Sequence, residues 1–214
     1  MHISELGIPG ALRVTPRHHS DERGLFLEWY RPDLIAEALG HPAAPMVQGN
    51  LSTSARGTIR GIHFAEVPYG QAKYVTCVRG AVLDVVVDLR VGSPMFGRWA
   101  AVELDDIRRE AVYVPEGLGH GFFALTETAT VSYLVSRPFE PEREHCVNAF
   151  DAELALPWPS RKAIRSERDR SAPPLSDLLH RGLLPSYEGC LSLTRRRSTP
   201  PPDSATDGPG TEVS

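Results

Sequence analysis

Short apolar segments separated by glycine, proline or charged residues run through the chain from residue 47 to residue 135. They are rich in Val, Tyr, Phe and Thr, and each is too short for a helix but long enough for a β-strand. Turn-forming residues bound each segment. The pattern predicts strands at Lys73–Arg79, Val82–Leu89, Arg98–Leu104, Ala111–Pro115, Gly121–Leu125 and Thr128–Val135. Regularly spaced short strands of this kind are typical of an antiparallel sandwich or barrel.

Glycine and proline positions predict where the chain turns and where its few helices lie. Gly80–Ala81 separates two of the predicted strands and is expected to form a hairpin-like turn. Pro32–Leu39 has proline in its first turn and Gly40 directly after it, which predicts a helix. Leu175–Arg181 has an acidic residue early and a basic residue late, with Gly182 as a stop, so a second helix is expected there.

The length of 214 residues fits one domain, and the last part of the chain differs in composition from the rest. Three arginines at 195–197 lead into STPPPDSATDGPGTEVS, which has almost no apolar side chains. Such a segment cannot offset the entropy lost on ordering by burying apolar surface. We therefore expect one folded domain at residues 1–193 and a disordered polar tail at residues 194–214.

Composition and charge argue against several classes of protein. The hydrophobic fraction of 41% and the charged fraction of 23% are ordinary for a globular protein, and the net charge of −4 argues against nucleic-acid binding. No apolar run approaches the roughly 18 residues that a membrane span needs, and the N-terminus lacks the features of a secretory signal. Cys77, Cys146 and Cys190 lie far apart without a C-x-x-C pair. We therefore expect a cytoplasmic protein with neither a membrane nor a nucleic acid as partner.

Several polar residues occupy positions where a β-barrel would ordinarily have apolar side chains. Arg60 and His63 lie three residues apart in an extended segment, so a bulge or twist is needed if both face one cavity. Lys73 opens a predicted strand, His120 lies between two glycines, and Tyr133 lies in an otherwise apolar strand. Taken singly, each has an ordinary interpretation, such as a hydrogen-bonded histidine, a solvated lysine or a core tyrosine.

Four stretches resemble the dTDP-4-dehydrorhamnose 3,5-epimerase family, nucleotide-sugar epimerases with a cupin-type jelly-roll fold. They are DERGLFLE at Asp21–Glu28, RGIH at Arg60–His63 with QAK at Gln71–Lys73, VRGAVLDVVVDLRVGSPMFGRW at Val78–Trp99, and VPEGLGHGFFALTETATVSY at Val114–Tyr133. The resemblance runs in order from about residue 5 to residue 185. The segment SERDRSAPPLSDLLHRGLLPSY most resembles members that make deoxysugars for antibiotics and other secondary metabolites.

The resemblance implies an all-β fold, a cupin-type jelly-roll sandwich with a few short helices, and an isomerase acting on a dTDP-4-keto-6-deoxyhexose. It implies that His63 is the catalytic base, that Asp169 pairs with it, and that Tyr133 is the acid on the opposite face of the sugar. Lys73 and His120 match residues that line the sugar site. The family also implies a homodimer that exchanges N-terminal strands.

Further residues match those that hold the nucleotide, the pyrophosphate or the sugar in the family: Arg23, Glu28, Gln48, Asn50, Arg60, Glu144 and Arg168. Gln48 and Asn50 are two residues apart, so both can face one side of a strand. Phe139 stands where members commonly have a tyrosine near the nucleotide base, and it keeps a stacking face without the hydroxyl. Arg168 stands where some members have lysine, and only arginine grips phosphate in a bidentate manner.

The chemistry of a 4-keto sugar explains why such residues are needed. The C–H bonds at C3 and C5 are acidic because they adjoin the carbonyl, and an enolate reprotonated from the other face has an inverted centre. Histidine is a suitable base near neutral pH, and Asp169 would fix its tautomer. A cation near O4 must stabilise the enolate, and Lys73 is the candidate. No metal or redox cofactor is expected, and the chain lacks the H-x-H motif of metal-binding cupins.

Several alternatives remain at this point. Inversion at C3, at C5 or at both fits the sequence equally, and a 3,4-ketoisomerase shares the fold. Tyr133 opposite His63 favours epimerisation, because inversion needs a second face. The alternatives of other classes are a non-catalytic sugar-nucleotide-binding cupin and a metal-dependent cupin oxygenase.

Overall fold

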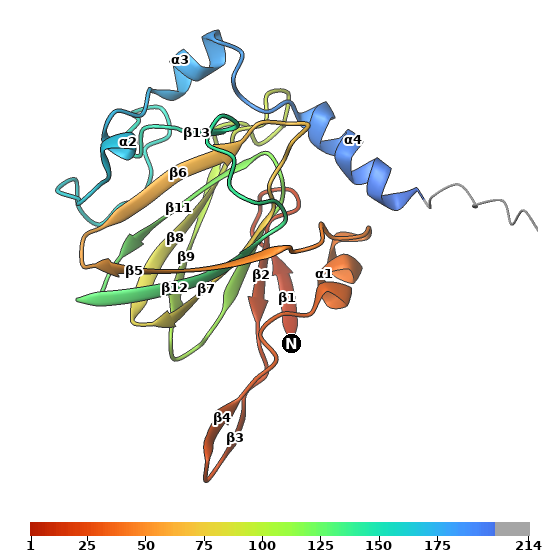
Figure 1. Cartoon of the computed structure of the whole chain (residues 1–214), viewed down its shortest axis with the longest axis vertical. Helices are drawn as coiled ribbons and strands as arrows, with labels where there is room; N and C mark the ends of the chain where they lie inside the picture. Colours follow the sequence, from red (N-terminus) through yellow and green to blue (C-terminus); the bar gives the residue numbers. More distant parts are fainter. Residues whose placement is uncertain (200–214) are drawn as a thin grey trace, which may run out of the picture.

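Two antiparallel sheets face each other in the computed structural model, which describes residues 1–199 (Figure 1). The first sheet has the strand order β1-β2-β10-β7-β12-β5 and the second has the order β13-β6-β11-β8-β9. A separate ribbon of β3 and β4 projects from the sandwich (Figure 1). The strands are β1 His2–Glu5, β2 Leu12–Thr15, β3 His19–Asp21, β4 Gly24–Phe26, β5 Gln48–Ala55, β6 Ile59–Ala65, β7 Lys73–Arg79, β8 Ala81–Asp88, β9 Trp99–Asp105, β10 Ala111–Val114, β11 Leu118–Ala124, β12 Thr128–Val135 and β13 Glu144–Cys146.

The predicted all-β jelly-roll sandwich is confirmed. From β5 to β13 the chain crosses repeatedly from one sheet to the other, so neighbours within each sheet are mostly distant in sequence. The predicted strands Lys73–Arg79 and Thr128–Val135 match β7 and β12 residue for residue, and the other predicted strands differ at their ends.

The turn at Gly80–Ala81 is not a hairpin, and the prediction of one was wrong. β7 pairs with β10 and β12, whereas β8 pairs with β9 and β11, so the chain changes sheets at this point. The Gly80 amide donates to Asp106, and the Ala81 amide donates to Thr126. Gly80 has a φ of 73°, which glycine adopts readily, so a crossing between sheets and a hairpin turn present the same sequence signal.

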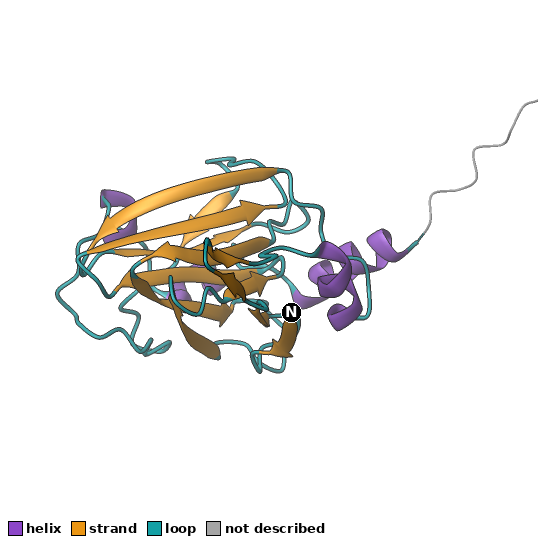
Figure 2. Ribbon diagram, turned by 90° about the horizontal axis from the view of Figure 1, so that it is seen from below, coloured by secondary structure: helices purple, strands orange, loops and turns teal. Residues whose placement is uncertain are grey.

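Figure 2 shows the strands of the sandwich from a second direction. Apolar side chains pack in three layers, one between the sheets and one on the outer face of each. The inner layer joins strands of both sheets through residues such as Val75, Val86, Phe122 and Val131. The outer layer on the second sheet includes Leu175 and Leu178 of α3, and that on the first sheet includes Ile35 of α1. Both sheets are thus held rigidly, which fixes the side chains that project between them.

The irregular pairing of β6 with β11 provides the bulge that the spacing of Arg60 and His63 requires. His63 pairs with His120 but Arg60 pairs with Phe122, so the register shifts between these two pairs. Gly61 lies at the shift with a φ of 121°, and a Cβ on it would lie 2.7 Å from the backbone of the facing strand. Because of the bulge, Arg60 and His63 line the same cavity.

The helices are α1 Pro32–Leu39, α2 Glu167–Arg170, α3 Leu175–His180 and α4 Tyr187–Ser198. The two predicted helices are confirmed as α1 and α3, and Gly40 ends α1 in the left-handed conformation. Within residues 1–199, no helix has the length and apolar character needed to span a membrane.

Helix α4 extends beyond residue 193, so the predicted start of the tail at residue 194 was too early. Arg197 forms an ion pair with Glu116, and the two side chains are only 20% and 9% exposed. This pair attaches the end of α4 to the segment that leads into β11. The sequence analysis had placed these arginines in a solvated tail and did not predict the contact. The rest of the predicted tail, residues 200–214, lies outside the described residues.

We predict that Arg197→Leu lowers the free energy of unfolding by about 1–3 kcal/mol, because it leaves the Glu116 carboxylate buried without its partner. Arg195→Leu is the matched control, since Arg195 pairs with Glu188 on the surface and its loss should cost less than about 0.5 kcal/mol. Urea unfolding followed by circular dichroism measures both. Equal effects of the two variants would contradict a structural role for the Arg197–Glu116 pair.

Candidate active site

A cavity of about 560 Å³ lies between the two sheets. Strands of both sheets, the segment that leads into α2 and α2 itself form its walls. Its polar lining consists of Ser52, Thr53, Ser54, Thr58, Arg60, His63, Lys73, His120, Tyr133, Arg165, Ser166, Arg168 and Asp169. Charged and proton-transferring groups converge on this hollow, as expected of a catalytic or binding site.

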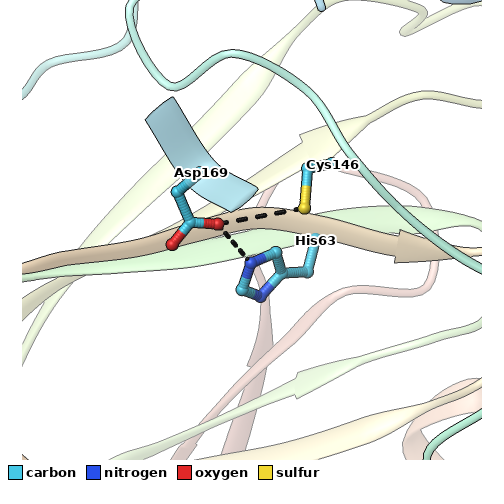
Figure 3. A group of neighbouring side chains, drawn as sticks. All are labelled: His63, Cys146 and Asp169. Carbon is cyan, nitrogen blue, oxygen red and sulfur yellow. Dashed lines mark hydrogen bonds and ion pairs between the residues drawn. The ribbon is translucent and has the colours of Figure 1, made fainter. Parts of the chain in front are cut away.

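His63 on β6 and Asp169 on α2 form the central pair of the cavity (Figure 3). The distance from His63 Nε2 to Asp169 Oδ1 is 2.7 Å. Ser166 caps α2, and its hydroxyl accepts a hydrogen bond from the Asp169 amide at 3.1 Å, so the position of the carboxylate is fixed from its own backbone. A neutral imidazole that donates from Nε2 has its lone pair on Nδ1, which lies away from Asp169 (Figure 3).

The environment keeps His63 neutral and Asp169 charged. Burial lowers the pKa of His63 below its ordinary value, and the nearby Lys73 cation acts in the same direction, while the hydrogen bond to Asp169 opposes both. Burial of Asp169 opposes its ionisation, but the hydrogen bonds from His63 and Ser166 outweigh it, so the pKa of Asp169 is lowered. A neutral histidine held by a carboxylate can accept a proton at neutral pH.

Tyr133 and Lys73 approach the cavity from the opposite sheet. Tyr133 lies on β12 and Lys73 on the adjacent β7. Burial raises the pKa of Tyr133, so its hydroxyl is protonated at neutral pH. Burial lowers the pKa of Lys73, and the carboxylates of Glu144 and Asp84 counteract this shift. A base on one wall therefore faces a proton donor and an amine on the other.

His120 belongs to a second histidine–carboxylate pair, which the sequence analysis missed. The distance from His120 Nε2 to Asp84 Oδ2 is 2.8 Å, and both side chains are buried. The pair joins β11 to β8, whose residues Phe122 and Asp84 lie opposite each other. The available signal was the charge of Asp84 within the apolar run of β8, because a buried carboxylate needs a partner.

Three predicted binding residues beside the cavity, Phe139, Glu144 and Arg168, form one connected group. The Arg168 guanidinium donates to the Glu144 carbonyl at 2.8 Å and lies 5.9 Å from the centre of the Phe139 ring. Gln71 Nε2 donates to the Glu144 carboxylate at 3.3 Å. Arg60 lines the cavity, where its Nε donates to the Ser54 hydroxyl at 3.0 Å.

Within residues 1–199, six predicted binding residues do not themselves line the cavity: Phe139 and Glu144 lie against the lining residue Arg168, and the other four are Gln48, Asn50, Arg23 and Glu28. Gln48 and Asn50 lie on β5 and share one side, as predicted, with Gln48 Nε2 donating to Asn50 Oδ1 at 2.8 Å. Arg23 lies in the turn between β3 and β4, where it pairs with Asp21. Glu28 follows β4 and is exposed. The ribbon whose turn holds Arg23 projects from the sandwich (Figure 1), and neither Arg23 nor Glu28 lines the cavity of its own chain.

Comparison with known proteins identifies the family. The family described as dTDP-4-dehydrorhamnose 3,5-epimerase matches residues 5–177. The chain belongs to the dTDP-4-dehydrorhamnose 3,5-epimerase family. The resemblance seen in the sequence is therefore confirmed, and the protein is an enzyme of the isomerase class.

Relatives of this epimerase include proteins named as 3-epimerases and proteins named as 3,5-epimerases. A dTDP-4-dehydrorhamnose 3-epimerase from Streptomyces niveus is 52% identical over 91% of this chain and 93% of its own. The 4-keto-6-deoxy sugar epimerase NovW, from the novobiocin cluster of Streptomyces spheroides, superposes with a TM-score of 0.86 at 53% identity, over 89% of this chain and 95% of that one. The rmlC epimerase of Mycobacterium tuberculosis superposes with a TM-score of 0.89 at 46% identity, over 92% of this chain and 100% of that one.

One further residue beside the His63–Asp169 pair of this epimerase was missed. Cys146 on β13 lies opposite His63 in the sheet register, and its Sγ lies 3.8 Å from Asp169 Oδ1 (Figure 3). The sequence analysis considered Cys146 only in counting cysteines. No local motif indicates the contact, because the pairing of β13 with β6 brings together residues far apart in sequence.

We predict that the His63 ring of this epimerase is half protonated below pH 6.5, because burial disfavours the imidazolium. Asp169→Asn should lower the pKa of His63 further, since it removes the carboxylate that favours the charged ring. Carbon-detected NMR titration of the histidine Cε1 signals measures the pKa, and His63→Gln assigns the resonance. Half-protonation above pH 6.5, or a higher pKa in Asp169→Asn, would contradict this account.

Proposed function

We propose that this protein epimerises a dTDP-4-keto-6-deoxyhexose at C3, C5 or both, in the biosynthesis of a deoxysugar. The observation that carries the proposal is the placement of His63 and Tyr133 on opposite walls of one cavity. Inversion requires removal of a proton from one face of a carbon and delivery to the other, and two groups on opposite walls suit that requirement. The named relatives support the substrate class.

His63 is the proposed base. Its Nδ1 takes the proton from the carbon beside the carbonyl, and Asp169 stabilises the imidazolium that forms. The carbon acid is far weaker than imidazolium, and each pKa unit of mismatch costs about 1.4 kcal/mol. The base alone therefore cannot drive the reaction, and the negative charge that develops on O4 needs a partner.

Lys73 is the proposed partner of O4, and Tyr133 is the proposed acid. The amine of Lys73 favours the enolate over the ketone, because only the enolate carries charge on oxygen. Tyr133 then donates its proton to the face opposite His63. His120, held by Asp84, supplies a further group to the sugar site. This sequence of steps moves protons only and calls for neither a metal nor a redox cofactor.

Arg60 and Arg168 are the proposed contacts of the pyrophosphate, and Phe139 of the nucleotide base. Both arginines line the cavity, and their guanidinium groups can pair with phosphate oxygens. Phe139 is 53% exposed beside Arg168, so its ring is available for stacking. Glu144, beside Arg168, is proposed to add a polar contact, and Gln48 and Asn50, which lie outside the cavity lining, to contact a part of the nucleotide that extends beyond it.

We also propose a homodimer in which the ribbon of β3 and β4 reaches the partner's cavity. The ribbon projects from its own sandwich and exposes apolar side chains, with Phe26 at 68% and Leu25 at 43%. Exposed apolar surface of this kind favours burial against another chain. Arg23 and Glu28 would then bind the nucleotide held in the partner's cavity, which accounts for their distance from their own.

For the activity we predict that incubation with dTDP-4-keto-6-deoxyglucose in D₂O places deuterium at C3, at C5 or at both, with inversion at the labelled centre. NMR of the product identifies the carbon. His63→Ala should slow the exchange by at least about 100-fold, the value of a positioned base. Wild-type exchange in His63→Ala would mean that another residue is the base, and no labelling by the wild type would contradict the function.

For the dimer we predict that light scattering gives twice the mass of one chain at micromolar concentration. A mixing experiment tests whether the ribbon is exchanged, using Arg23→Ala and His63→Ala variants that are each impaired alone. After subunit exchange, mixed dimers contain one intact site, so about a quarter of all sites should recover. No recovery in mixed dimers would contradict the assignment of Arg23 to the partner's cavity.

A further inference from the structure

Cys146 adds a thiol to the catalytic pair, and the proposed reaction does not use it. Its side chain is buried, at 6% exposed, and Sγ lies 3.8 Å from Asp169 Oδ1 (Figure 3). His63 and Cys146 occupy directly opposed positions on β6 and β13. Because the two strands are rigidly paired, the thiol and the imidazole are held on the same side of Asp169.

The three side chains present the donor set of a transition-metal site. A ring nitrogen of His63, Sγ of Cys146 and a carboxylate oxygen of Asp169 all lie within 4.8 Å of one another. In a tetrahedral zinc site, bonds of about 2.0–2.3 Å separate neighbouring ligand atoms by roughly 3.3–3.8 Å. The 2.7 Å contact between His63 and Asp169 would therefore open slightly, and the thiol would approach the ring. Small movements of side chains are enough to form such a shell.

We propose that His63, Cys146 and Asp169 form a binding site for Zn²⁺ and similar borderline-soft ions, and that occupation of this site inhibits the enzyme. Imidazole and thiolate are the ligands that these ions prefer, and three protein ligands leave a fourth position for water. The inhibition rests on the proposed epimerase function, whereas the binding of the ion does not.

The route of inhibition follows from the tautomer of His63. The Nε2 of His63 donates to Asp169 in the resting site, and Nδ1 has the lone pair. A metal ion bound at Nε2 requires the lone pair there, so the ring proton of the neutral ligand moves to Nδ1. The nitrogen proposed to accept the substrate proton is then already protonated. The Cys146 thiol releases one proton to solvent when it binds the ion as thiolate.

Neighbouring charges limit the affinity of the site. Asp169 and the Cys146 thiolate attract a divalent ion, but the Lys73 and Arg168 cations act on His63 at close range and oppose it. The site therefore suits a reversibly bound, inhibitory ion rather than a permanent structural one.

Titration of the purified, chelator-treated protein with Co²⁺ tests the binding directly. We expect a thiolate-to-cobalt charge-transfer band in the near ultraviolet, which Cys146→Ala and Cys146→Ser should both lose. Cys190→Ala is the matched control, because Cys190 is equally buried but lies on α4, and it should keep the band. A band that persists without Cys146, or Co²⁺ binding without any thiolate band, would overturn the proposal.

Inhibition by Zn²⁺ is measured as the rate of deuterium exchange into the dTDP-sugar, with each variant compared with its own metal-free rate. Mutation of a residue that only hydrogen-bonds to a metal ligand typically lowers metal affinity by about 10–100-fold. Loss of Cys146, a direct ligand, should raise the half-inhibiting Zn²⁺ concentration by at least that factor. Equal sensitivity of Cys146→Ala and wild type would overturn the inhibitory role. Should the wild type not turn over this sugar, the proposed function fails, and the cobalt band still decides whether the site binds metal.

Discussion

The hydrogen bond between His63 and Asp169 determines how the rest of the cavity can act. At 2.7 Å it fixes the tautomer of the ring, directs Nδ1 away from the carboxylate, and moderates the fall in the pKa of His63 that burial causes. The bond joins a strand of the sandwich to a one-turn helix, whose capping residue Ser166 holds Asp169 in place. The proposed base therefore depends on a contact between two residues that lie 106 positions apart in the sequence.

The two-layer architecture supplies the second requirement of the proposed reaction, which is access to both faces of a sugar ring. β6 carries His63 on one wall, while β7 and β12 carry Lys73 and Tyr133 on the other. The apolar layer between the sheets holds the walls at a fixed spacing, so the groups need not move far to reach a bound ring. The bulge at Gly61 adds Arg60 to the same wall as His63, which a regular strand would not allow.

The sequence predicted the local features well and the long-range contacts less well. Six strands, two of them with exact ends, two helices and the need for a bulge near His63 followed from periodicity and turn residues, because these signals are local. The crossing at Gly80 was mistaken for a hairpin, since glycine serves both. Family resemblance identified His63 and Asp169, but the pairing of His120 with Asp84 and the approach of Cys146 depend on strand register. The end of α4 was assigned to the tail because its arginines suggest solvent, whereas Arg197 has a partly buried partner.

The central claim is that His63 and Tyr133 act on opposite faces of one carbon, and Tyr133→Phe in D₂O tests it most directly. This change removes the proton donor and leaves the base, so His63 should still exchange the proton on its own face. We predict deuterium in the recovered substrate with retained configuration, while the epimerised product falls by roughly 10²–10⁴-fold, the usual value of a positioned acid. Equal loss of exchange and inversion would assign Tyr133 to shaping the cavity, and inversion at the wild-type rate would contradict the two-residue mechanism.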